Sequence, residues 1–245
     1  MSHFMQLIIK ETEDDFHREA AMLVSRQVLQ KPDSVIGLAT GNTTKGIHKW
    51  MIHFHKELSI DYSMCKTCNL DEYIGVSPAD PGSCCYRIKE ELLNHLNTLP
   101  ENTYIPDSLT PSLERELDIF KNKVNDFGGV DLQIIAIGQN GHIAFNEPGT
   151  PFDSTYSIVS IPQSTVAARA GIFGGEDKVP KQGITMGIAD IMMARKILLV
   201  ASGSGKADMV RQVLTGPVTE QIPASVLRLH PNVVFVMDKK AASEI

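Results

Sequence analysis

The sequence lacks the features that would place this chain in a membrane or on a nucleic acid. No apolar run reaches the roughly 18 residues that a membrane span needs. No charged leader followed by an apolar stretch marks a secretory signal. A net charge of −6 and a pI near 5.7 argue against a general binder of nucleic acid or anionic membranes. We therefore expect a cytoplasmic protein with residues 1–4 as an expression remnant, and an anionic small molecule stays open as a ligand.

Cysteine is scarce, and its spacing does not suit a metal site. Cys65 and Cys68 form a C-x-x-C pair, but Cys84 and Cys85 are adjacent, whereas a structural zinc site usually repeats the C-x-x-C knuckle. The first pair also lies in an expected strand, where positions i and i+3 face opposite sides. We expect buried or partly buried free thiols and no bound metal.

The chain also lacks repeats, linkers and low-complexity segments, so we expect residues 1–245 to form one domain of alternating strands and helices. This alternation predicts one doubly wound, mainly parallel α/β sheet of the Rossmann-like type, with helices on both faces. The expected strands are 7–9, 35–39, 65–70, 132–137, 157–160, 184–186, 196–201 and 233–237, and the expected helices are about 13–30, 45–56, 83–96, 113–126, 164–171 and 188–193, with another ending at 214.

The strand 132–137 is followed by a glycine-rich stretch that carries Asn140, His142 and Glu147. In open α/β sheets, ligands bind at the carboxyl ends of the strands. An imidazole and a carboxylate at such a strand end are typical of an active site. The alternative is a loop that merely contains a histidine and a glutamate.

Two other strand ends suit a phosphate. Residues 40–43 (Thr-Gly-Asn-Thr) lie between a strand and a helix, where N–H groups can converge on an anion. The alternative is an ordinary helix cap by Thr43 or Thr44. Lys206 ends a glycine-rich turn, but Val200 and Ala207 break the P-loop pattern, which argues against a nucleotide triphosphatase.

A fourth strand end carries two adjacent carboxylates, Asp71 and Glu72, for which the alternative is a solvated turn before Gly75. Because the carboxyl ends of parallel strands share one edge, the four segments can meet in one pocket. Phosphate-holding turns beside acid–base groups suit proton transfer on a sugar phosphate. Clustered carboxylates near a phosphate repel each other, which raises a carboxyl pKa and strengthens the group as a base.

Five stretches resemble the glucosamine-6-phosphate deaminase/isomerase family, in the family's order and over nearly the whole chain. The run Gly-His-Ile-Ala-Phe-Asn-Glu-Pro at 141–148 is highly specific. The matching stretches are 37–43, 69–73, 138–149, 179–181 with 184–187, and 203–206.

The resemblance implies a sugar-phosphate isomerase fold and a role for each matched residue. His142 would assist opening of the pyranose ring, with Asn140 and Glu147 completing its relay. Asp71 would carry a proton from C2 toward C1 of the open-chain sugar, so that ammonia leaves and fructose 6-phosphate forms from glucosamine 6-phosphate. No metal or organic cofactor is implied. The phosphate would be held by Thr40, Gly41, Asn42, Thr43 and Lys206.

The chain departs from the family pattern in places that concern the substrate. Thr44 stands where the family usually has proline, and Gly171 aligns with the family's phosphate-binding arginine. Arg169 lies two helical positions away, which turns it about 200° around the axis, so it is not a simple replacement. Residues 81–84 (Pro-Gly-Ser-Cys) look more like relatives assigned to galactosamine 6-phosphate. Residues 157–159 lack the basic pair of members that amino sugars activate, so we predict no such activation.

Two other functions share this architecture. This chain has Asp-Glu-Tyr at residues 71–73 and Phe-Asn-Glu-Pro at residues 145–148. The pattern of the 6-phosphogluconolactonases has Asp-Glu-Arg and Ser-Leu-Phe-Pro at the matching positions. A sugar-phosphate-sensing regulator would normally add a helix-turn-helix and, without catalysis, would be expected to lose the base or the histidine. The sequence leaves open which hexosamine phosphate is bound and whether the chain forms a homo-oligomer.

Overall fold

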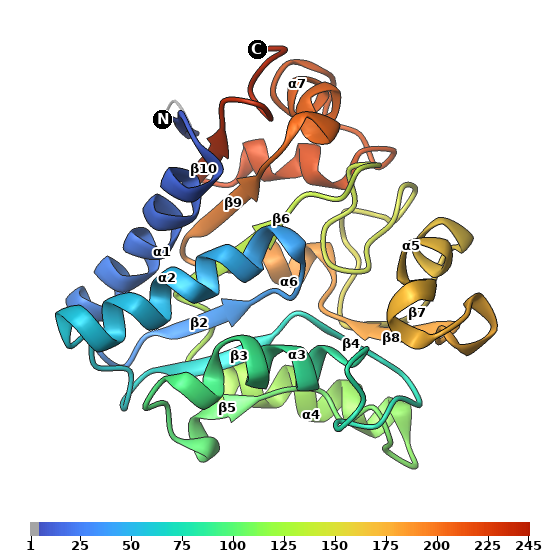
Figure 1. The fold of residues 1–245 in the computed structure, drawn as a ribbon. Helices are drawn as coiled ribbons and strands as arrows, with labels where there is room; N and C mark the ends of the chain where they lie inside the picture. The colour runs from blue at the N-terminus through green and yellow to red at the C-terminus, as the bar shows by residue number, and fades with distance from the viewer. Residues whose placement is uncertain (1–4) are drawn as a thin grey trace.

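A computed structural model describes residues 5–245 and confirms the doubly wound sheet (Figure 1). Residues 1–4, expected to be an expression remnant, lie outside the described part. The seven strands run in the order β1-β10-β9-β6-β2-β3-β5, and every neighbouring pair is parallel. These strands are β1 Gln6–Lys10, β2 Val35–Leu38, β3 Lys66–Asn69, β5 Thr103–Tyr104, β6 Leu132–Ala136, β9 Ile197–Ala201 and β10 Val233–Asp238.

Helices cover both faces of this sheet because its central strands are apolar on both sides. In β9, Leu198 and Val200 face the core under α1, α2 and α3, whereas Ile197, Leu199 and Ala201 face the core under α4, α6 and α7. The helices are α1 Glu13–Gln30, α2 Asn42–Leu58, α3 Cys84–Glu91, α4 Leu113–Asp126, α5 Gln163–Phe173, α6 Ile188–Met192 and α7 Ala207–Thr215. Short 3-10 helices are η1 Leu93–His95, η2 Pro100–Asn102, η3 Glu176–Lys178, η4 Ser204–Lys206 and η5 Pro223–Leu229.

A second sheet of three antiparallel strands was not expected. It has the order β4-β8-β7, with β4 at Asp71–Tyr73, β8 at Gln182–Thr185 and β7 at Ser157–Ser160. The segments 157–160 and 184–186 were predicted as strands of the main sheet, and this prediction is wrong because they form β7 and β8 of the small sheet. After Leu70 the chain leaves the main sheet and pairs with β8 instead. Figure 1 shows β7, β8 and α5 together at one side of the molecule.

The four cysteines are free and buried, as expected from their spacing. Within residues 5–245, no group of three or more His, Cys, Asp or Glu side chains is arranged to hold a metal ion. Across the same part of the chain, no helix combines the length and the apolar character that crossing a membrane requires.

Candidate active site

A cavity of about 600 Å³ lies at the carboxyl ends of the central strands. The four segments predicted to converge do meet here, each placed by the strand that precedes it. The separate alternatives of an incidental loop, a plain helix cap and a solvated turn therefore do not account for the arrangement. The predicted site residues that line the cavity are Thr40, Gly41, Asn42, Thr43, Asp71, Asn140, His142, Glu147 and Lys206.

Asn140, His142 and Glu147 form a hydrogen-bonded relay after β6. The His142 Nδ1 atom lies 2.7 Å from the Asn140 Oδ1 atom and 3.4 Å from a carboxylate oxygen of Glu147. The Asn140 amide donates to the other Glu147 oxygen at 2.6 Å. Because the Asn140 carbonyl must accept, His142 carries its proton on Nδ1, which leaves Nε2 as the acceptor. Burial lowers the pKa of His142, against the raising effect of the Glu147 charge, so the neutral ring is favoured.

Hydrogen bonds within the loop 138–147 and to Met186 fix the conformation of this loop. The Gly138 N–H donates to the His142 carbonyl at 2.9 Å, and Asn146 is buried, donating to the Ile143 and Met186 carbonyls at 3.0 Å each. The second of these bonds ties the loop to the end of β8. Asn146 therefore fixes the loop in place, while its neighbours in sequence face the cavity.

We expect Gly138→Ala to lower turnover at least tenfold, because the His142 ring packs directly against the Gly138 Cα and an added Cβ would overlap it. A displacement of about 1 Å in a catalytic group can cost about 100-fold. Steady-state kinetics of the variant would measure the loss. Gly171→Ala is the matched control, since a Cβ there meets no atom within 4 Å. Unchanged turnover in Gly138→Ala would show that the ring position does not matter.

Asp71 is the first residue of β4 and faces the cavity. Burial and the neighbouring Glu72 charge raise the pKa of Asp71 to about 7, against the lowering effects of the Cys84 thiol, Arg169 and Arg87. The Cys84 S–H lies 3.6 Å from an Asp71 oxygen. Since burial raises the pKa of Cys84 well above its usual value, the thiol stays protonated and can donate. A carboxyl of this kind changes charge near neutral pH, as a general base should.

Glu72 does not line the cavity but anchors the wall behind Asp71. Its fully buried carboxylate accepts from the backbone N–H groups of Cys84 and Cys85 at 2.9 and 2.7 Å and from the Ser83 hydroxyl at 2.9 Å. It thus binds the N-terminus of α3, where a helix favours negative charge. Burial still raises the pKa of Glu72, even though these hydrogen bonds act in the opposite direction.

The turn 40–43 follows β2 and Lys206 follows β9, the two strands that flank β6. No side chain caps the N-terminus of α2, so its first N–H groups remain available to an anion. Lys206 donates to the Ile137 carbonyl at 2.8 Å. Burial lowers the pKa of Lys206 to about 8, so the ammonium is only partly retained above that pH.

Two arginines that were not predicted as site residues also line the cavity. Arg169 reaches it from α5 and Arg87 from α3. Gly171, where the resemblance led us to expect an arginine, has open space around its Cα. Its position two residues before Gly171 singles out Arg169 in the sequence. Nothing in the sequence singles out Arg87, because an arginine within an amphipathic helix usually faces solvent.

Comparisons with known proteins agree over nearly the whole chain. A family model described as glucosamine-6-phosphate isomerases/6-phosphogluconolactonase matches residues 10–235. A glucosamine-6-phosphate deaminase of Thermoanaerobacter pseudethanolicus is 41% identical over 98% of this chain and 95% of its own length. A glucosamine-6-phosphate deaminase of Lachnoclostridium phytofermentans is 43% identical over 95% of this chain and 98% of its own.

Solved structures show the same fold. A monomeric glucosamine-6-phosphate deaminase superposes with a TM-score of 0.95 at 37% identity, covering 98% of this chain and 100% of the other. A 6-phosphogluconolactonase from Trypanosoma brucei superposes with a TM-score of 0.79 at 19% identity, covering 100% of both chains. The second likeness concerns the fold alone.

Proposed function

The chain belongs to the glucosamine-6-phosphate isomerase/6-phosphogluconolactonase family, and we propose that it works as a glucosamine-6-phosphate deaminase/isomerase. The single observation that carries this proposal is the meeting of Asp71 with the His142–Glu147 relay and the turn 40–43 in one cavity. An aldose–ketose shift needs a base at the carbon acid and an acid–base group at the ring oxygen. The cavity offers both beside a place for a phosphate.

Ring opening is assigned to His142. Its neutral imidazole, held through Nδ1 by Asn140, presents Nε2 as an acceptor for the anomeric hydroxyl proton and can return a proton to the ring oxygen. Glu147 lies 3.4 Å from Nδ1 and stabilises the imidazolium that forms between these two transfers. Asn140 holds both partners in this geometry.

The carbon chemistry is assigned to Asp71. In the open-chain aldehyde, its carboxylate takes the proton from C2, and the electron pair forms a C1–C2 double bond. The C2 ammonium gives one proton to the C1 oxygen, which yields a neutral enolamine. The same carboxyl then returns the proton to C1, which leaves a hydroxymethyl group at C1 and an iminium at C2. Water adds to the iminium, and ammonia leaves to give the ketose phosphate. One water molecule is consumed, and no step requires a metal or an organic cofactor.

The phosphate is assigned to the turn Thr40, Gly41, Asn42 and Thr43 and to Lys206. Free N–H groups at the start of α2 and the Lys206 ammonium suit a phosphate monoester. The four cysteines are free, and free thiols are typical of reducing compartments, so we propose a cytoplasmic location.

A lactonase function is less well supported. The lactonase structures that resemble this chain are 15–19% identical to it, against 37% for the monomeric deaminase. The chain also has Tyr73 and Asn146 at the positions where the lactonase pattern has arginine and leucine. In this structure Asn146 is buried and ties the site loop to Met186, a contact that a leucine cannot make.

Ammonia release from glucosamine 6-phosphate and galactosamine 6-phosphate, measured side by side, tests the proposal. We expect ammonia and ketose phosphate from the glucosamine compound, and the galactosamine compound, which differs only at C4, is the second candidate. Production of neither ammonia nor ketose phosphate from either sugar would overturn the enzyme proposal in favour of a sensor. A ketose formed without ammonia would indicate a different isomerase substrate.

A further inference from the structure

Arg87 is a cationic wall residue of the cavity with no role in the chemistry assigned above. It lies in α3, and only 12% of its side chain is exposed. One turn earlier in the same helix is Cys84, which contacts Asp71. One turn later is Glu91, the last residue of α3. The three positions 84, 87 and 91 share one face of the helix.

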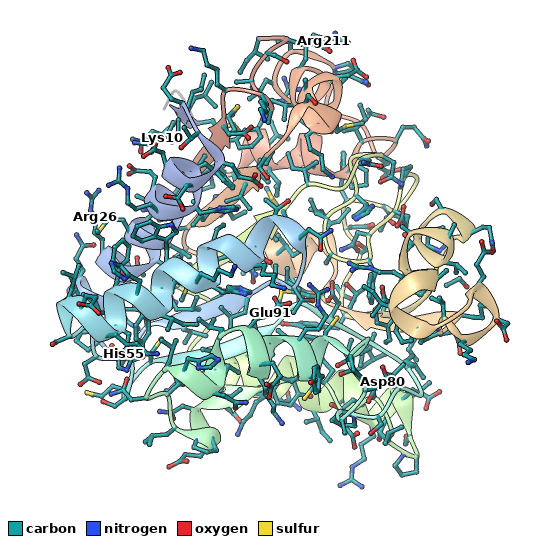
Figure 2. All side chains as sticks on the ribbon, in the orientation of Figure 1. Lys10, Arg26, His55, Asp80, Glu91 and Arg211 are labelled. Carbon is teal, nitrogen blue, oxygen red and sulfur yellow. The ribbon has the colours of Figure 1, made fainter. Side chains whose placement is uncertain are left out.

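That face of α3 is directed toward α2 and fixes where Arg87 lies. The Cys84 thiol is within hydrogen-bonding reach of the Thr40 side chain, just before α2 begins. At the other end, a Glu91 oxygen lies 3.7 Å from Nδ1 of His48, which is fully buried in α2. Figure 2 shows Glu91 between the two helices. Arg87 lies between these two contacts and is therefore beside the first turn of α2.

Glu91 orients the guanidinium without using all of its donors. The Nε and Nη2 atoms of Arg87 lie 3.4 and 3.3 Å from the same Glu91 oxygen. A guanidinium has five N–H donors in a planar fork, so the remaining donors can serve a ligand. Burial lowers the pKa of His48, and the neutral ring behind Glu91 leaves this carboxylate to pair with Arg87.

Two other cations line the cavity in the described chain, and one of them, Lys206, already belongs to the proposed phosphate site. Lys206 donates to the Ile137 carbonyl, and burial lowers its pKa to about 8. The Arg169 charge acts on Asp71, Tyr73 and His142, whereas the Arg87 charge acts on Asp71 and on His48 in α2. Arg87 is a permanent cation that lines the same cavity as the turn 40–43.

We propose that Arg87 binds the substrate's phosphate together with the N–H groups of the turn 40–43, so that α3 supplies the arginine absent at Gly171. The inference rests on the proposed function in one respect, that the substrate is a sugar phosphate. A fork of donors beside free helix N–H groups suits an anion with several oxygens. Arg87 is a binding residue, and the proton transfers remain with Asp71 and His142.

The test uses Arg87→Gln, Arg87→Lys and the double variant Arg87→Gln/Glu91→Gln. The double variant removes the buried partner charge together with the cation, in case Arg87→Gln alone does not fold. Lys89→Ala, an exposed charge on the same helix, is the control. Inorganic phosphate is the binding probe, followed by calorimetry and by its stabilising effect on thermal unfolding. KM and kcat are measured with glucosamine 6-phosphate.

We expect Arg87→Gln and the double variant to bind inorganic phosphate about 10- to 100-fold more weakly and to raise KM by a similar factor, as the loss of a charge-assisted fork implies. The value of kcat should change less than about threefold, because Arg87 holds the same group in ground and transition states. Arg87→Lys should lie in between.

Phosphate binding equal to wild type in the folded variants would overturn the inference. So would a loss of phosphate binding in Arg169→Gln that Arg87→Gln does not share. The phosphate measurement does not depend on activity. A wild-type protein that binds phosphate through Arg87 but releases no ammonia would overturn the proposed function and leave this inference standing.

Discussion

Asp71→Asn is expected to slow ammonia release from glucosamine 6-phosphate by about 10²- to 10⁴-fold, the usual contribution of a well-placed general base. The amide is nearly isosteric with the carboxylate but cannot accept the C2 proton. Binding should persist, since the phosphate contacts lie elsewhere in the cavity. In deuterated water, NMR should show that the variant no longer exchanges the C2 proton with solvent.

The pH dependence of the wild-type enzyme supplies a second measurement of the same residue. Burial and the Glu72 charge raise the pKa of Asp71 to about 7, and only the deprotonated form is a base. The rate should therefore rise as pH increases through about 7. This acidic limb should be absent from any residual activity of Asp71→Asn. Asp126→Asn, which changes an exposed carboxylate at the end of α4, is the control. Exchange at the wild-type rate in Asp71→Asn would show that another group is the base.

Most strands of the main sheet were predictable from their local sequence, and the exception is the two-residue edge strand β5, which was not expected. β6 and β9 are short apolar runs that end at glycine-rich turns, and α1 and α4 have a period of 3.6 with clear limits. The small sheet was not predictable in this way. Its strand β4 is three residues long and carries two carboxylates, and only its antiparallel pairing with β8, more than a hundred residues later, makes it a strand. Tertiary pairing of this kind leaves little periodicity in the sequence.

The site residues likewise fall into those that local sequence and topology predict and those that depend on tertiary packing. Residues at the ends of parallel strands could be placed together from topology alone, and the cavity confirms that they meet. Glu72 is adjacent to Asp71 in the sequence, yet it does not line the cavity and binds the N-terminus of α3. Arg87 and Cys84 reach the cavity only because that anchor presents one face of α3 to α2. Such contacts depend on how helices pack, which spacing within one segment does not specify.

His142→Gln is expected to slow deamination by about 10²- to 10⁴-fold, because ring opening loses its acid–base group. Glutamine retains a polar side chain of similar reach, but it neither exchanges protons near neutral pH nor completes the relay through Asn140 to Glu147. An open-chain amino-alditol phosphate, which cannot form a ring, should bind the variant as tightly as it binds wild type. Competitive inhibition by this compound, measured beside turnover, separates the two effects.

The comparison between His142 and Asp71 distinguishes their two steps. In His142→Gln, substrate that opens spontaneously still meets an intact base, so C2 exchange of the open-chain form should persist while overall turnover is limited by opening. In Asp71→Asn, exchange itself should be lost. His53→Gln, an exposed histidine on α2 outside the cavity, controls for the substitution. Turnover near the wild-type rate in His142→Gln would contradict the ring-opening role, and equal loss of C2 exchange in both variants would show that His142 and Asp71 act on the same step.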